Sequence, residues 1–259
     1  MKHSISIMLS VVILYAVTAV TPLEAQQKKA RKKNTPETTT SEQTSTQVGK
    51  PSALDPNRKA DPEMIKLDSA QKSARRYTSL EEALKEPENV ELLDLHEQNL
   101  TSLPPEIGKL VNLHTLSLYD NKLSSLPNEF ANLKNLKSVD FGKNEFTEIP
   151  VVVTKLKGLK VLYFTSNQIT KIPKELFTLT KLSVLDFAGN RLTEIPKDIV
   201  KLTNLRLLNL RFNKIDKLPT NMGSMKNLEQ IQLNSNPISE AELRRIEGML
   251  KTTDVRFNY

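Results

Sequence analysis

The sequence contains no cysteine and no tryptophan, and aromatic residues make up only 5% of its 259 residues. Without cysteine the chain cannot form disulfides, thiolate metal sites or a cysteine nucleophile, and it offers no cysteine for lipid modification. Glycine-rich phosphate-binding loops, nucleophile elbows and zinc-protease motifs are also missing. These absences argue against the common enzyme classes, and they leave the hydrophobic core to hold the folded chain together.

The net charge of +7 is unevenly distributed along the chain. Residues 1–76 carry 13 Lys and Arg against 7 Asp and Glu, whereas residues 77–259 carry 24 against 23. A basic run such as 28–33 can contact anionic lipid, nucleic acid or a wall polymer, but it is more commonly a solvated linker. The remainder is nearly neutral, and we therefore expect no nucleic-acid partner.

The first 25 residues have the order of a secretory signal peptide. Lys2 precedes an apolar stretch at 5–20, and Ala25 ends the segment. Sixteen apolar residues span about 24 Å as a helix, short of a hydrocarbon core of about 30 Å. We predict cleavage after Ala25 and export to the periplasm, the cell surface or the medium.

Two features support a different topology. Leu23 occupies a site where signal peptides usually have a small residue, and the positive charges at 28–33 resist translocation. The alternative is an uncleaved inner-membrane anchor with the rest of the chain in the cytoplasm. Contact with the membrane would then come only through this N-terminus.

The next two segments differ sharply in composition. Residues 26–60 are rich in Thr, Ser, Gln, Lys and Pro and lack apolar periodicity, which predicts a disordered linker. Residues 61–89 are predicted to form an N-terminal helical cap, because Ser79 and Glu82 match a capping box and Pro87 then ends the helix.

The strongest signal is a 23-residue period that runs without insertion from Val90 to Ile238. With Val90 at position 1, seven units fit one register. Positions 4, 6 and 11 are aliphatic or Phe in every unit, and position 15 is Pro in the first six. Position 9 is Gln98 in the first unit and asparagine in the other six: Asn121, Asn144, Asn167, Asn190, Asn213 and Asn236.

Each repeated position has a physical reason. Positions 4 and 6 point to one side of a short strand, and strands of successive units stack in parallel about 4.8 Å apart. The amide at position 9 can satisfy backbone groups where the strand ends, each of which costs about 1–3 kcal/mol if buried without a partner. Proline at position 15 begins the return segment. One unit buries too little apolar surface to fold alone, so stability must come from stacking.

These residues follow the pattern LxxLxLxxNxLxxLPxxIxxLxxL, which resembles the leucine-rich repeat superfamily in the LP-containing form of bacterial short-repeat proteins and Ras-signalling scaffolds. The resemblance covers residues 90–238 closely. It implies an α/β, right-handed leucine-rich repeat solenoid with a parallel β-sheet on the concave face and short helices or 3-10 turns on the convex side. The segment 239–259, with a capping box at Ser239 and Glu242, is predicted to add a C-terminal cap helix and an edge strand.

Positions 3, 5, 7 and 8 are predicted to project from the concave face, and there the sequence stops repeating. In repeats four to six, apolar residues with charged neighbours predict an exposed contact patch. The candidate partner-binding residues are Tyr119, Val161, Tyr163, Val184, Asp186, Leu207, Asn209, Arg211 and Phe212.

Catalytic and metal-binding arrangements are not expected. Asp94, Asp140 and Asp186 share position 5 but lie on alternate strands about 10 Å apart, too far to share an ion. We predict that they are solvated. His96 and His114 lie at positions 7 and 2 of different units, also too far apart for one metal.

The sequence as a whole predicts a monomeric, non-enzymatic module without cofactor or metal, exported, that recognises a partner protein on its concave face. Two alternatives remain open. One is a membrane-anchored cytoplasmic signalling scaffold, and the other is a surface adhesin that binds a glycan or a wall polymer.

Overall fold

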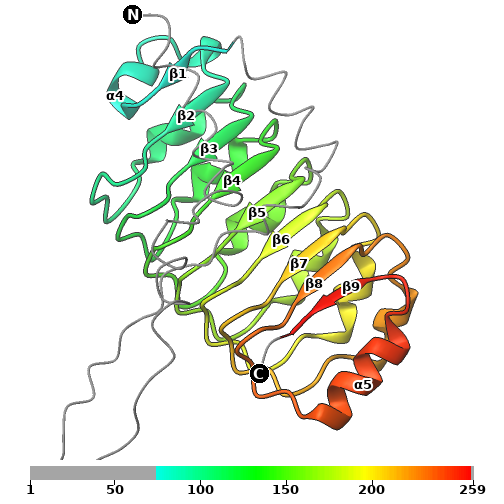
Figure 1. The fold of residues 1–259 in the computed structure, drawn as a ribbon. Coiled ribbons are helices and arrows are strands. Elements are labelled where there is room, and N and C mark those ends of the chain that lie inside the picture. The colour runs from blue at the N-terminus through cyan, green and yellow to red at the C-terminus, as the bar shows by residue number, and fades with distance from the viewer. Residues whose placement is uncertain (1–73, 258–259) are drawn as a thin grey trace, which may run out of the picture. The chain divides into compact units, whose positions relative to one another are not determined.

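The computed structural model describes residues 74–257, which form one sheet of nine parallel strands in chain order (Figure 1). The predicted signal peptide, the predicted linker and residues 61–73 of the predicted cap lie outside the described residues. The strands are β1 (Arg76–Tyr77), β2 (Leu92–Asp94), β3 (Thr115–Ser117), β4 (Ser138–Asp140), β5 (Val161–Tyr163), β6 (Val184–Asp186), β7 (Leu207–Asn209), β8 (Gln230–Gln232) and β9 (Asp254–Arg256).

Short 3-10 helices line the face of the sheet opposite the concave one (Figure 1). They are η1 (Pro87–Asn89), η2 (Pro105–Lys109), η3 (Asn128–Asn132), η4 (Val151–Lys155), η5 (Lys174–Thr178), η6 (Lys197–Lys201) and η7 (Thr220–Ser224). The position-15 proline precedes each of η2 to η7 directly, as at Pro104 and Pro219, so the predicted start of the return segment is confirmed. The two α-helices are α4 (Leu80–Ala83) and α5 (Glu240–Met249).

The strand register repeats the sequence period. Leu93 pairs with Leu116, and Leu116 pairs with Val139, an offset of 23 residues at each step. Positions 4 and 6 are buried in every unit. A row of stacked and edge-on rings runs through the middle of this core, because Phe164 lies 4.9 Å from Phe141 and 6.1 Å from Phe187 between ring centroids.

The asparagines at position 9 form the predicted ladder. Asn167 accepts from the backbone N–H of Phe146 at 3.1 Å and donates to the carbonyls of Phe141 and Phe164 at 2.9 and 3.2 Å. The same pattern joins each asparagine to its own unit and to the preceding one, as at Asn213. Each side chain therefore fastens two neighbouring repeats where their strands end.

The N-terminal cap contains a strand that the sequence analysis missed. β1 pairs with β2, with Arg76 opposite Leu92, and so covers the first edge of the sheet. A two-residue strand is too short to show a period of its own in the sequence. Helix α4 follows with the predicted cap, because the Ser79 hydroxyl accepts from the Glu82 amide, although the helix is only four residues long.

The C-terminal cap closes the other end. The Ser239 hydroxyl accepts from the Glu242 amide and begins α5, whose Ile246 is fully buried. The Glu242 carboxylate also accepts from the Leu218 amide at 3.0 Å, which ties the helix to the last full repeat. Strand β9 then pairs with β8. Within residues 74–257, neither helix is long and apolar enough to cross a bilayer.

Candidate functional site

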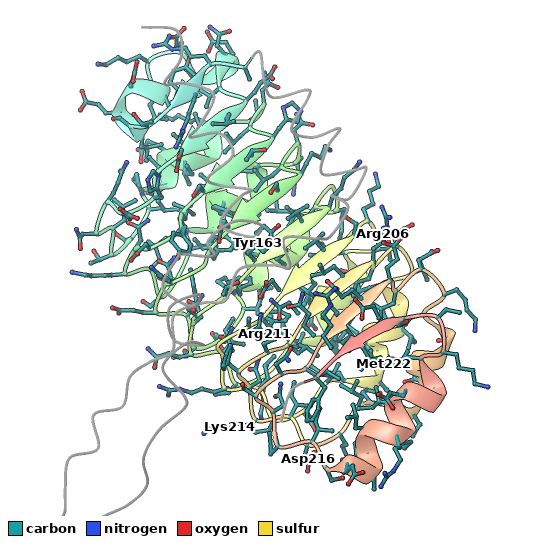
Figure 2. The ribbon with its side chains drawn as sticks, in the orientation of Figure 1. Tyr163, Arg206, Arg211, Lys214, Asp216 and Met222 are labelled. Carbon is teal, nitrogen blue, oxygen red and sulfur yellow. The ribbon has the colours of Figure 1, made fainter. Side chains whose placement is uncertain are left out.

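The concave face is built from alternate strand positions. Because positions 4 and 6 point into the core, positions 3, 5 and 7 point the other way. In Figure 2, Tyr163 and Arg211 lie on the sheet side, whereas Met222 lies among the return segments. The predicted binding residues from Val161 to Phe212 thus come from β5, β6, β7 and the residues that follow β7.

The apolar members of the predicted patch have little accessible surface, which differs from the expected exposed patch. Val161 and Val184 are each 3% exposed, and Leu207 is 1% exposed. Tyr163 is 9% exposed. Residues at one position of neighbouring strands lie only about 4.8 Å apart, so their side chains shield one another. Phe212 is the exception, with 41% of its surface exposed.

The prediction that the position-5 carboxylates are solvated was wrong for Asp94 and Asp186, which are buried, whereas Asp140 is half-buried. The Asp140 carboxylate accepts from the Gly142 backbone N–H at 2.7 Å. Asp186 accepts from the Ala188 N–H at 2.8 Å and from the Asn209 side chain at 2.7 Å. A short side chain at position 5 can reach the N–H two residues later, which satisfies that donor at the end of the strand. Sequence reasoning counted position 5 as outward-facing and missed this local bond.

Asp94 has a second role at the N-terminal end of the sheet. Its side chain is buried and pairs with the Arg76 guanidinium, and it lies 2.7 Å from Nδ1 of His96. It also accepts from the His96 N–H at 3.2 Å. The buried charge is thereby paired and hydrogen-bonded, as burial of a carboxylate requires.

Two of these carboxyls are electrostatically perturbed. Burial raises the pKa of Asp140 to about 7, the Gly142 N–H opposes the shift, and the nearby Asp186 adds to it. Burial also raises the pKa of Asp186, against the opposing effect of the Ala188 N–H. These two strand-end groups therefore favour their neutral forms more than ordinary aspartates do.

Arg211 and Phe212 form the most distinctive part of the face. The Arg211 guanidinium lies 5.3 Å from the centroid of the Phe212 ring. Burial lowers the pKa of Arg211, and Asp186 opposes that effect. Phe212 has a left-handed backbone with φ of 53°. Every other unit also places position 8 in this region, with Glu97, Asp120, Lys143, Ser166, Gly189 and Ser235 there.

Tyr119 stands apart from that group. A Cβ at Gly142 would lie 2.9 Å from the Tyr119 ring, so the glycine leaves room for the ring beside it. The Lys143 ammonium lies 4.9 Å from the ring centroid and 2.9 Å from the Asp120 carboxylate. Tyr119 and Arg211 are four strands apart, about 19 Å at the usual spacing. The structure therefore divides the predicted residues between two regions of the face.

Residues 74–257 contain no group of three or more His, Asp or Glu side chains arranged to hold a metal ion. His96 contacts Asp94, and His114 belongs to the backbone ladder through its N–H to Glu91.

Comparisons with known proteins agree with this geometry. A family model described as a leucine-rich repeat region matches residues 151–256, and a model for two copies of leucine-rich repeats matches residues 111–154. The comparison with curated proteins found no match. The repeat region of this chain belongs to the leucine-rich repeat superfamily.

Solved structures show the same architecture. An internalin (inlF) from Listeria monocytogenes aligns with a TM-score of 0.59 and 21% identity, over 72% of this chain and 54% of that one. An internalin C2 from the same organism aligns with a TM-score of 0.51 and 23% identity, over 68% of this chain and 84% of that one. The chain thus spans about half of the first internalin. At these identities the likeness shows the solenoid fold alone.

Proposed function

We propose that the chain is an exported protein-interaction module that binds a partner protein on its concave face. The leucine-rich repeat fold supports a role in protein binding. The contact is centred on the C-terminal half of the face, around Arg211 and Phe212. The buried side chains of Tyr163, Asp186 and Asn209 lie on the same face beside these two residues.

The main support for this proposal is the exposed, left-handed position of Phe212. A bulky side chain gains nothing from a left-handed backbone, since that conformation is costly for every residue except glycine and, to a lesser degree, asparagine or aspartate. Phe212 is also 41% exposed, so it gains only part of the stability that burial would give. Neither local conformation nor the core explains a phenylalanine here. An exposed aromatic ring beside an arginine is typical of an energetic centre in a protein interface.

The substitution Phe212→Gly tests the proposal. Glycine is already present at this position in Gly189, with φ of 67°. We expect the stability of the variant to change by about 1 kcal/mol or less, because relief of the strained φ offsets the loss of the partly buried side chain. We expect it to lose most of its partner binding, by about 2 kcal/mol or more. Partners captured from the cells that make the protein would be identified by mass spectrometry and their affinities measured.

Val151→Ala provides the matched control. Val151 is 59% exposed but belongs to η4 on the convex side. Loss of an exposed apolar side chain there should leave partner affinity unchanged. If Phe212→Gly retains full affinity, or if Val151→Ala weakens binding equally, the concave face is not the binding surface.

Export is the second part of the proposal, and the signal-like order of residues 1–25 supports it. N-terminal sequencing of the mature protein should begin at Gln26. An intact Met1 in the membrane fraction would instead support the anchored cytoplasmic scaffold.

A further inference from the structure

Lysine side chains collect at the amino ends of the central strands, away from the concave site. Positions 22, 23 and 2 of each repeat lead into the strand. In repeats two to four these positions form a surface that we call the basic edge: Lys134, Lys137, Lys157, Lys160 and Lys181. The backbone holds successive units in register here, because the Lys160 N–H donates to the Lys137 carbonyl at 2.8 Å.

Charge on the basic edge is of one sign. The segments 131–139, 149–163 and 176–185 contain no acidic residue. Within residues 74–257, four of these side chains form no salt bridge with a carboxylate: Lys134, Lys137, Lys157 and Lys181. The Lys157 ammonium donates to two neutral acceptors, the Thr154 carbonyl at 2.7 Å and the Thr178 hydroxyl, so its charge is not neutralised. By contrast, Arg206 at position 2 of a later repeat pairs with Glu229 at 2.6 Å. Like charges on adjacent strands destabilise a sheet, so this arrangement has a cost.

A second loss of stability concerns the hydrogen bonds that connect neighbouring repeats. Position 23 carries asparagines that form another ladder, one that sequence reasoning missed. Asn135 donates to the Val111 carbonyl at 3.0 Å and Asn204 to the Thr180 carbonyl at 2.7 Å, and Asn112 and Asn227 repeat the bond. The ladder is interrupted at Gly158, which has no side chain, and at Lys181, which has no carboxamide.

Both interruptions fall within the basic edge. A Cβ at Gly158 would lie 3.1 Å from the Lys137 ammonium and 3.1 Å from the Lys134 carbonyl. The glycine therefore leaves space for the lysine. At the other interruption an asparagine is replaced by one more positive charge. The chain departs from its own structural repeat where the lysines gather, which points to a ligand that needs them.

We propose that the basic edge binds a linear anionic polysaccharide. Lys134 and Lys157, and likewise Lys137 and Lys160, occupy equivalent positions of adjacent repeats whose strands lie about 4.8 Å apart, so their ammonium groups can contact successive carboxylates or sulfates of an extended polymer. Single-stranded nucleic acid favours aromatic stacking platforms beside the basic groups, and peripheral membrane binding favours large apolar anchors. The segments 132–138, 155–160 and 178–183 contain no aromatic residue, and the exposed apolar residue at the equivalent place in the first repeat, Val111, is a valine and not a large anchor, so the polysaccharide fits best. This surface is separate from the proposed protein-binding face.

Heparin serves as the probe, with the full chain at 150 mM NaCl (about the physiological ionic strength). The edge variant replaces Lys134, Lys137, Lys157 and Lys160 with Gln. The matched control replaces Lys122, Lys171, Lys214 and Lys217 with Gln, which removes the same charge. These lie after the strands, and Figure 2 shows Arg206 and Lys214 at opposite ends of β7. We expect the edge variant to bind heparin about tenfold or more weakly and the control to change by about twofold or less.

Three outcomes would overturn the proposal. The first is an equal loss of heparin affinity in the edge variant and the control. The second is complete loss of heparin binding when the basic residues at 28–33 alone are replaced. The third is tighter binding of an oligothymidylate or of phosphatidylserine vesicles, with the same dependence on the edge. Loss of edge-dependent heparin binding would leave the Phe212 contact untouched, so the two proposals fail independently.

Lys181→Asn separates function from folding. The new carboxamide can restore the ladder bond to the Lys157 carbonyl, so we expect the urea midpoint of unfolding to rise. We expect heparin affinity to fall in the same variant. A lower midpoint, or an unchanged affinity, would contradict the view that stability at this position is given up for charge.

Discussion

At the scale of single residues, side chains at position 5 show how local bonding changes the chemistry of a repeat. Asp140, Asp186 and Asn209 each accept from the N–H two residues later. The interaction needs an acceptor but not a charge, because Asn209 makes it as a neutral amide. A carboxylate at this place therefore adds a desolvation cost that an asparagine avoids.

Asp140→Asn should change the pH dependence of stability. The pKa of Asp140 is about 7 in the folded protein against 3.8 in an unfolded chain. Between those values the folded state binds more protons, so its stability falls as pH rises from about 4 to 7. Asn keeps the acceptor for the Gly142 N–H and removes this loss. We expect a gain of about 1–3 kcal/mol at pH 8, allowing for partial exposure, and little gain at pH 4.

Urea denaturation at the two pH values measures this effect. Asp186, whose pKa is also raised, leaves some pH dependence in the variant. A variant that is destabilised equally at both pH values would show that the negative charge of Asp140 stabilises the fold.

At the scale of the repeat, the position-9 asparagine has the largest number of bonds to its surroundings. It forms hydrogen bonds with backbone groups of two units, whereas a position-23 asparagine forms one hydrogen bond at an exposed site. The two ladders therefore differ in energetic weight, although both recur at the same period.

Asn167→Ala should destabilise the protein by about 2–4 kcal/mol, because several buried backbone groups lose their partners at about 1–3 kcal/mol each. Asn204→Ala, the matched control, should cost about 1 kcal/mol or less, since its carbonyl partner can bond to water instead. Thermal and urea unfolding compare the two. Equal losses would mean that the position-9 ladder is no more important than the exposed one.

At the scale of the whole described domain, stability depends on stacking, and both ends of the stack are covered. The sheet is open, with β1 and β9 at its two edges. Helix α5 and β9 cover the last repeat and bury Ile246 and Leu250. Uncovered parallel edges expose unpaired backbone groups and apolar side chains, which promote self-association.

Removal of residues 239–259 should expose the β8 edge together with Ile231 and Leu233. We expect a clear fall in the melting temperature, a less cooperative transition and concentration-dependent association. Size-exclusion chromatography with light scattering and thermal unfolding measure these changes. A truncated chain that stays monomeric and melts like the wild type would show that the cap contributes little.

The sequence by itself determined the solenoid, because core positions 4, 6 and 11 and the asparagine at position 9 recur every 23 residues and need only neighbouring units to satisfy them. Only the tertiary structure decided the rest. Strand β1, the raised pKa of Asp140, the exposure of Phe212 and the space that Gly158 leaves for Lys137 all depend on which atoms of adjacent repeats come together. A repeated pattern predicts which face a residue occupies. The burial, charge state and contacts of that residue depend on neighbours that lie one repeat away in sequence and about 5 Å away in space.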